Sequence, residues 1–173
     1  PISCNTYEKN FNFKPVYEDI CKLESIPDCD VLTGGFPCQG FSLANILRSE
    51  EDNRNTLDLQ LVRLLKLKKP KYFVFENVKG IRSIGGYESN EDKKLGRGKV
   101  IKMIEKDLEE CGYDVHIKLF RMKWYDIPQN RERIIFLGIR NDIAKHVDFQ
   151  WPEEKQVITK TLKDAIYDLS IEY

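Results

Sequence analysis

The sequence predicts an α/β protein with a mainly parallel sheet and helices on both of its faces. Two observations lead to this prediction. Short apolar runs alternate along the chain with segments whose apolar residues recur at helical spacing. The apolar runs are also continuous, as in Tyr72-Phe73-Val74-Phe75, which is the pattern of parallel strands buried on both faces. A chain of 173 residues is long enough for one domain with a sizeable core.

The N-terminal part of the chain predicts a helix end and two short strands. Residues 1–13 have the pattern of the last turns of a helix and the turn that follows it. Residues 16–20 form a strand candidate that carries an acid near its end, and residues 30–33 form a short buried strand. Residues 45–55 are polar and charged without an apolar period, and we expect them to form a mobile loop.

The middle of the chain predicts a helix, a buried strand and a second loop. Leucines recur at helical spacing over residues 56–67, and Thr56 is a suitable N-cap. The strand at 72–75 follows and ends in Glu76-Asn77-Val78. The glycines, serines and charged residues of 83–99 then indicate a further flexible loop.

The C-terminal part predicts a helix followed by two strands. Apolar residues recur at helical spacing over residues 100–111, and Gly112 is a natural helix stop. Residues 113–122 alternate like a strand, and residues 134–139 form another buried strand. Because no helix separates these two strands, we expect them to pair antiparallel. Residues 161–169 indicate a short terminal helix.

Composition and charge exclude several classes of protein. Lys+Arg and Asp+Glu both number 28, so bulk positive charge cannot drive nucleic-acid binding, which must come from a local basic face or from parts outside this chain. No apolar run is long enough to span a membrane, and the N-terminus lacks a signal-peptide pattern. Five cysteines without paired spacing argue against a disulfide framework or a zinc site. We therefore expect a metal-free protein in a reducing cytoplasm.

One cysteine stands at a position that suits a nucleophile. The strand at 30–33 leads into Gly34-Gly35-Phe36-Pro37-Cys38-Gln39-Gly40-Phe41-Ser42, where the glycines and the proline hold the backbone in a tight loop. A rigid strand would thus deliver Cys38 to a turn that a substrate can reach. Phe36 and Phe41 would flank the thiol with aromatic surface, and Gln39 adds an amide for hydrogen bonding. Taken alone, a buried structural cysteine in a glycine-rich connection explains the pattern better.

Further charged groups lie at predicted strand ends. Glu76 ends a buried strand, where α/β sheets place carboxylates for chemistry, although a salt-bridged or helix-capping acid has the same pattern. Arg131 and Arg133 are two positions apart on a strand-like segment, so we expect their side chains on one face. A surface arginine pair would look the same.

Three segments, taken together, resemble the cytosine-5 DNA methyltransferase family. They are Gly-Phe-Pro-Cys-Gln-Gly-Phe-Ser at 35–42, Glu-Asn-Val at 76–78 and Gln-Asn-Arg-Glu-Arg at 129–133, in the order of the family's motifs. The resemblance covers nearly the whole chain. It implies the S-adenosylmethionine-dependent methyltransferase (Rossmann-like) fold, with a mostly parallel sheet and an antiparallel end strand. It also implies S-adenosylmethionine as methyl donor, S-adenosylhomocysteine as product and no metal.

The same resemblance assigns residues to the cofactor and to the substrate. Asp19-Ile20 resembles the acid-plus-apolar pair that contacts the cofactor adenine, and Pro37 and Leu57 join this set. The segment at 52–57 resembles the family's D-x-R-G-T-L, with Asn55 where glycine is usual. The residues implied to shape the substrate loop are Phe36, Gln39, Gly40, Ser42, Asn77 and Gln129.

Parts of the family's pattern are missing from the chain. The opening strand and Gly-rich turn that hold the cofactor's methionine part, and the acid that binds its ribose, have no counterpart here. We therefore expect residues 1–173 to be a partial catalytic domain, incomplete at its N-terminus, with 151–173 leading toward a target-recognition region. The complete protein is expected to be monomeric, or to pair with a separate chain if the gene is split. Alone, the chain should bind the cofactor weakly, turn over little and expose the sheet edge at 30–33.

The implied chemistry uses the predicted strand-end residues. Cys38 would add to carbon 6 of a cytosine flipped out of double-stranded DNA, while Glu76 shares a proton with ring nitrogen 3. Arg133 would hold the base carbonyl, and Arg131 the loop or a phosphate. The loop at 43–55 would close over the base. The expected setting is a restriction-modification system in a bacterial cytoplasm.

Two other functions remain open at this point. The first is a tRNA cytosine-5 methyltransferase of the same fold, although the Cys-Phe-Thr signature common in that branch is absent. The second is a non-catalytic fragment that binds a partner or DNA. An intact set of Cys38, Glu76 and the two arginines argues against this second function without excluding it.

Overall fold

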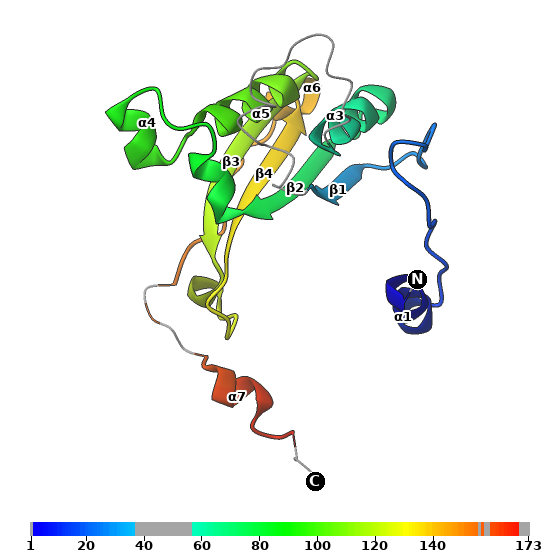
Figure 1. Cartoon of the computed structure of the whole chain (residues 1–173), viewed down its shortest axis with the longest axis vertical. Coiled ribbons are helices and arrows are strands. Elements are labelled where there is room, and N and C mark those ends of the chain that lie inside the picture. Colours follow the sequence, from blue (N-terminus) through cyan, green and yellow to red (C-terminus); the bar gives the residue numbers. More distant parts are fainter. Residues whose placement is uncertain (1, 37–56, 156, 158–159, 170–173) are drawn as a thin grey trace.

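Four strands form a single mixed sheet at the centre of the protein (Figure 1). The computed structural model describes residues 2–36, 57–155, 157 and 160–169, with the side chains of 57 and 58 left aside. The strands are β1 (Val31–Gly35), β2 (Tyr72–Val78), β3 (Tyr113–Arg121) and β4 (Glu132–Arg140), and their order across the sheet is β1-β2-β4-β3.

The direction of β4 makes the sheet mixed. β1 pairs parallel with β2, whereas β4 pairs antiparallel with both β2 and β3. The α/β class and the antiparallel pairing of the last two strands are confirmed. Three of the four strands run in one direction, as predicted for a mostly parallel sheet, but the reversed strand β4 lies inside the sheet and not at its end. A short connection folds β4 back against β3 as a hairpin, and its other edge then completes the hydrogen bonding of β2.

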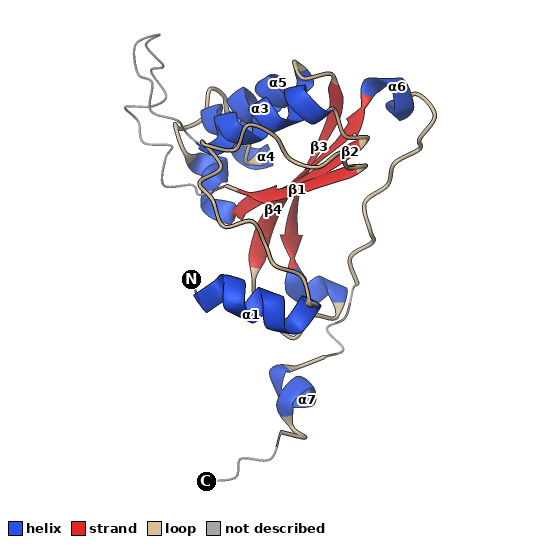
Figure 2. Ribbon diagram, turned by 90° about the vertical axis from the view of Figure 1, so that its right-hand side faces the viewer, coloured by secondary structure: helices blue, strands red, loops and turns tan. Residues whose placement is uncertain are grey.

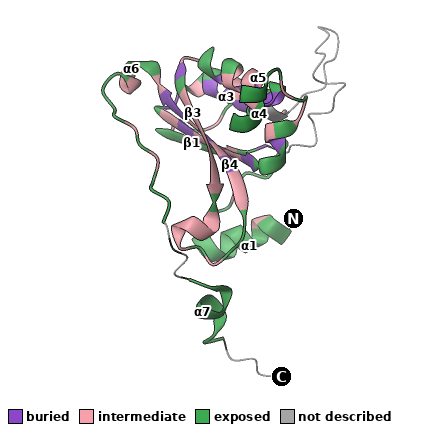
Figure 3. Ribbon diagram, turned by 90° about the vertical axis from the view of Figure 1, so that its left-hand side faces the viewer, coloured by how far each residue is buried: buried purple, intermediate pink, exposed green. Residues whose placement is uncertain are grey.

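Two helices cover one face of the sheet (Figure 2). These are α3 (Leu57–Lys68) and α5 (Lys99–Glu109), which contact one another. The remaining helical segments are α1 (Ile2–Phe11), η2 (Lys79–Ser83), α4 (Asn90–Leu95), η3 (Met122–Tyr125), α6 (Asn141–Ala144) and α7 (Leu162–Ile166). Both α1 and α7 lie apart from the sheet and have no buried residue (Figure 3).

The core lies between the sheet and the two covering helices. On β2, Phe73, Phe75 and Asn77 are buried, while the residues that alternate with them are half-buried or, at Val78, exposed. The expectation of helices on both faces is therefore not met within the described part of the chain. Gly138 of β4 lies opposite Phe73, whose ring occupies the space where a Cβ would be, 1.9 Å from its Cε1. This glycine allows the aromatic ring to lie flat across the neighbouring strand.

Two local predictions are wrong, each for a physical reason. Residues 16–20 form no strand, because the Asp19 side chain accepts a hydrogen bond from the Cys21 N–H at 3.0 Å and turns the backbone. Residues 83–99 are not a featureless loop, because they contain α4, which is capped by the Ser89 side chain and ended by Gly96 at φ 66°. The edge position of β1, which pairs only with β2 among the described strands, agrees with the predicted exposed edge.

Candidate active site

Three strand ends meet at one edge of the sheet. The register places Gly35 at the end of β1 opposite Glu76 on β2, and Val78 on β2 opposite Arg133 near the start of β4. Arg133 is thus the diagonal neighbour of Glu76 on the same face of the sheet. Parallel and antiparallel pairing together bring residues from three distant parts of the sequence to this edge.

Glu76 and Arg133 form an ion pair between their carboxylate and Nε. The side chain of Arg133 is 18% exposed and that of Glu76 is 44% exposed. Arg133 Nη1 also donates to the Glu132 carbonyl at 2.8 Å, which fixes the guanidinium against its own strand. The Nε–H lacks the alignment of a directed hydrogen bond to any described residue, so the contact is mainly electrostatic.

The small size of Gly35 leaves the Glu76 carboxylate open. A Cβ at position 35 would lie 3.4 Å from Glu76 Oε2. With hydrogen there instead, this carboxylate is accessible on the side of β1, next to the start of the Cys38 loop. The site therefore offers an accessible carboxylate beside a held cation, an arrangement that can bind a ring nitrogen and a neighbouring carbonyl oxygen.

Asn77 anchors the chain that enters the Cys38 loop. Its side chain is 2% exposed and faces the covered side of the sheet. Nδ2 donates to the Phe36 carbonyl at 2.8 Å, and Oδ1 accepts from the Val78 N–H at 2.8 Å. A buried amide with both functions satisfied is a rigid clamp, because breaking either bond leaves a polar group unpaired. Asn77 thus sets the position of the residue two places before Cys38.

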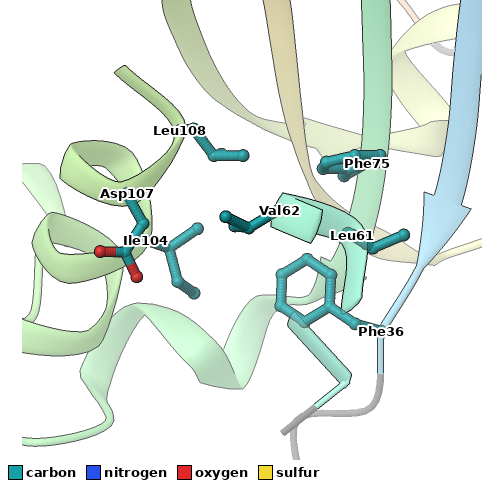
Figure 4. Close-up of a pocket in the computed structure, with 7 residues that line it drawn as sticks. All are labelled: Phe36, Leu61, Val62, Phe75, Ile104, Asp107 and Leu108. Carbon is teal, nitrogen blue, oxygen red and sulfur yellow. The ribbon is translucent and has the colours of Figure 1, made fainter. Parts of the chain in front are cut away.

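Phe36 is a second anchor of the segment that leads into the Cys38 loop. Its ring is 6% exposed and points into an apolar pocket between α3, α5 and the sheet (Figure 4). The ring lies 6.0 Å from that of Phe136 and leaves a cavity of only about 10 Å³. The ring therefore packs into the core, while the thiol that Phe36 is predicted to flank lies outside the described residues. The pocket is lined by Phe36, Leu61, Val62, Phe75, Ile104, Asp107 and Leu108.

Several predicted residues lie outside the described part of the chain. They are Pro37, Cys38, Gln39, Gly40, Phe41, Ser42, the loop at 43–55, Thr56 and the side chain of Leu57. Of the two arginines, the structure brings Arg133 to Glu76 but not Arg131. Arg131 and Gln129 are exposed in the connection before β4, where the Arg131 carbonyl accepts from the Met122 N–H at 2.9 Å.

The role of Glu132 was not predicted from the sequence. This residue lies between the two arginines, so strand alternation turns its side chain to the opposite face from Arg133. There it accepts from Lys79 at 2.7 Å and from Arg121 at 3.1 Å. The Lys79 hydrogen bond is the main cause that lowers the pKa of Glu132. No sequence pattern signalled this link between β4 and the residue after β2, because the strand register creates it.

Asp19 and Ile20 form a compact turn near α3. The backbone N–H of Cys21 lowers the pKa of the exposed Asp19 carboxyl. Ile20 packs against the core, and its carbonyl accepts from Arg63 Nη2 at 3.0 Å. An ionised carboxylate beside an apolar side chain suits an adenine, because the carboxylate accepts from the exocyclic amine while the apolar group contacts the ring. The predicted cofactor pair is thus chemically fit for that role.

Two other kinds of site are not found in the described part of the chain. Among these residues, no group of three or more His, Cys, Asp or Glu side chains is arranged to hold a metal ion. Within the same residues, no helix combines the length and apolar character needed to cross a membrane.

The sequence matches the family model of C-5 cytosine-specific DNA methylase over residues 2–172. It is 40% identical to Type II methyltransferase M1.ScrFI of Lactococcus lactis subsp. cremoris, and the match covers 96% of this chain and 41% of the relative. It is 36% identical to the orphan methyltransferase M.SPRI of Bacillus phage SPR, covering 90% of this chain and 33% of that protein.

Solved structures share the fold. A prophage-encoded E. coli protein described as a DNA modification methyltransferase superimposes with a TM-score of 0.66 at 25% identity, covering 98% of this chain and 46% of that one. The Dnmt2 methyltransferase of S. pombe gives a TM-score of 0.58 at 20% identity, covering 87% and 41%. The chain therefore spans less than half the length of the relatives it matches.

Proposed function

The chain belongs to the C-5 cytosine-specific DNA methylase family, and we propose that it carries the catalytic centre of a DNA cytosine-5 methyltransferase. The substrate is a cytosine flipped out of double-stranded DNA, because carbon 5 cannot be reached inside the duplex. The methyl donor is S-adenosylmethionine. The Type II name of the Lactococcus lactis relative supports a place in a restriction-modification system. DNA is then the partner, and the complete protein acts as a monomer.

Cys38 is the nucleophile of the proposed reaction. Carbon 5 of cytosine is too weak a nucleophile to take a methyl group unaided. Addition of the Cys38 sulfur to carbon 6 removes the aromaticity of the ring and makes carbon 5 enamine-like. The sulfur later serves as the leaving group. The anchored Phe36 and Asn77 support this role, because they hold the backbone just before Cys38 in one position.

Glu76 and Arg133 act on the ring during this addition. Glu76 shares a proton with ring nitrogen 3 and so reduces the charge that builds up in the ring. Arg133 holds the neighbouring carbonyl oxygen. In the free protein the two side chains satisfy one another as an ion pair. On binding, a proton shared between Glu76 and ring nitrogen 3, together with a hydrogen bond from Arg133 to the carbonyl oxygen, replaces this ion pair.

The cofactor is held in part by residues of this chain. Asp19 and Ile20 would contact the adenine, and the family resemblance assigns Pro37 and Leu57, which lie outside the described residues and side chains, to the same set. The bound cofactor supplies an activated methyl group on a sulfonium. This chain's share of the work is to fix the adenine and to place Cys38 and the cytosine beside that methyl group. Removal of the carbon 5 proton and expulsion of Cys38 then complete the reaction.

The observation that carries the proposal is the meeting of the Glu76–Arg133 pair with the anchored start of the Cys38 loop at one sheet edge. The test is methyl transfer from labelled S-adenosylmethionine by the complete gene product, with duplex DNA and tRNA as competing substrates. We expect methylated duplex DNA, and we expect none from the Cys38→Ser variant. A matched Cys111→Ser change should leave the rate unaltered. Preferred methylation of tRNA, or full activity of Cys38→Ser, would contradict the proposal.

A further inference from the structure

A basic pocket follows directly after the catalytic strand. It has a volume of about 370 Å³ and is formed by η2, α4 and the segment that connects them. Its first residue, Lys79, is three positions beyond Glu76. The lining residues are Lys79, Gly80, Arg82, Ser83, Tyr87, Lys93, Lys94 and Gly96. Four of them are cations and none is acidic, in a protein whose formal net charge is zero.

The acidic groups of this region are engaged elsewhere or do not line the pocket. Glu88 and Asp92 both pair with Lys102 of α5, at 2.9 and 2.8 Å. Glu132 pairs with Lys79 at 2.7 Å but does not itself line the pocket. Glu91, the remaining acid of α4, is exposed and is not part of the lining. The positive charge of the pocket is therefore only partly compensated.

Arg82 holds the pocket together. Its Nε donates to the Gly96 carbonyl at 3.2 Å, and its Nη2 donates to the Leu95 carbonyl. Glycine suits position 96 because its φ of 66° lies in the left-handed region, and a Cβ there would also lie 2.1 Å from Arg82 Nη2. The guanidinium thus neutralises the carbonyl end of α4, where a cation is favoured. Arg82 thus holds α4 against η2, and this contact fixes the position of Lys93 and Lys94 on α4.

Lys93 and Lys94 are the cations available to a ligand. Both are exposed on α4, and neither forms an ion pair with a described residue. Figure 1 shows α4 set apart from the sheet, on the side toward which β2 runs. Lysine ammonium groups act as point charges for phosphates, while a serine hydroxyl and a tyrosine in the same lining add hydrogen-bonding capacity. Such a set binds a phosphodiester backbone without reading its sequence.

We propose that this pocket binds backbone phosphates of the duplex DNA beside the cytosine that is methylated. The inference rests on the proposed function and adds a contact surface that holds the substrate strand next to Glu76. Lys93 and Lys94 make the phosphate contacts, and Arg82 is a positioning residue. Because the chain as a whole carries no net positive charge, these contacts account for a measurable share of the salt dependence of DNA binding.

The test is the salt dependence of DNA affinity. The dissociation constant of the complete gene product for duplex DNA is measured over a series of NaCl concentrations, for wild type and for Lys93→Gln/Lys94→Gln. Each lost phosphate contact lowers the slope of log K against log[salt] by roughly 0.9, so the double variant should lose about two units of slope. Its affinity at physiological salt should fall by about tenfold.

The matched control is Lys106→Gln/Lys145→Gln, which removes the same charge from exposed positions away from the pocket. Its slope should equal that of wild type, and thermal unfolding should be the same for all three proteins. Equal slopes for the two double variants, or a loss seen with tRNA but not with duplex DNA, would overturn the inference. A wild-type protein that neither binds nor methylates duplex DNA would instead contradict the proposed function.

Discussion

Glu76 and Asn77 are neighbours on β2, yet they face opposite sides of the sheet. Asn77 lies on the side covered by α3 and α5, is 2% exposed and has both halves of its amide bonded. Glu76 lies on the open side, is 44% exposed and contacts only Arg133 by ion pairing among the described residues. One face therefore fixes the backbone that leads to Cys38, and the other presents groups for chemistry. The comparison predicts that changes on the open face reduce rate, whereas changes on the covered face reduce stability.

The largest effect is expected from Glu76→Gln. Glutamine keeps the shape but cannot share the proton, so single-turnover methylation should slow roughly 10²- to 10⁴-fold. The free energy of unfolding should change by less than about 1 kcal/mol, because the side chain is half-exposed. Single-turnover kinetics and urea denaturation measure the two quantities. Glu132→Gln, on the opposite face of the neighbouring strand, is the control and should slow the reaction less than about tenfold.

Gly138→Ala should give the largest loss of stability. A Cβ at this position overlaps the buried Phe73 ring, and such overpacking costs about 1–3 kcal/mol. Gly80→Ala is the matched control, since no atom lies within 4 Å of the place its methyl group would take. Urea denaturation should show a lower midpoint for Gly138→Ala only. Equal midpoints would mean that the covered face tolerates added volume. They would contradict the expectation that changes on this face reduce stability.

Asn77→Ala tests whether the covered face also governs the loop. It leaves the Phe36 carbonyl and the Val78 N–H without their partner, at a cost of about 1–3 kcal/mol. It should also slow methylation at temperatures where the protein stays folded, because the chain before Cys38 loses its anchor. Asn77→Asp keeps an acceptor for Val78 but loses the donor to Phe36. Full activity in both variants would show that the anchor does not position the loop.

The smallest effect is expected from Tyr113→Phe, at the far end of the same covered face. Burial raises the pKa of Tyr113 from 10.0 to about 12, and its hydroxyl donates to the Pro70 carbonyl at 2.7 Å. Because the folded protein holds this proton more tightly, the stabilisation is complete below pH 10 and is lost as the pH rises to about 12. Tyr113→Phe should cost about 1 kcal/mol near neutral pH. Denaturation curves from pH 8 to 12 should fall less steeply for the variant.

Local patterns in the sequence were enough to place the strand end that carries Glu76. The continuous apolar run before Glu76 indicated a buried strand, and the position of Glu76 at its end followed directly. The position of β4 between β2 and β3 was not predictable, because an apolar run does not state which strand it pairs with. The burial of the Phe36 ring was not predictable for a related reason, since an aromatic residue next to a loop has the same sequence pattern whether it faces substrate or core.

The short helix α4 shows the limit of periodicity. Its six residues are nearly all charged or polar, so it has no apolar stripe. The spacing Ser89-x-x-Asp92 and the following Gly96 were nevertheless its cap signals, and both are used as caps in the structure. The Lys79–Glu132–Arg121 network joins residues 53 positions apart in the sequence, and only the strand register reveals it.

Covalent trapping tests the central claim most directly. A duplex that carries 5-fluorocytosine at the target site blocks the final proton removal, so the proposed intermediate should accumulate on the complete gene product in the presence of S-adenosylmethionine. Peptide mapping of the trapped complex should locate the DNA on Cys38, and Cys38→Ser should form no complex. A stable adduct on any other residue, or trapping that persists in Cys38→Ser, would contradict the assignment of the nucleophile.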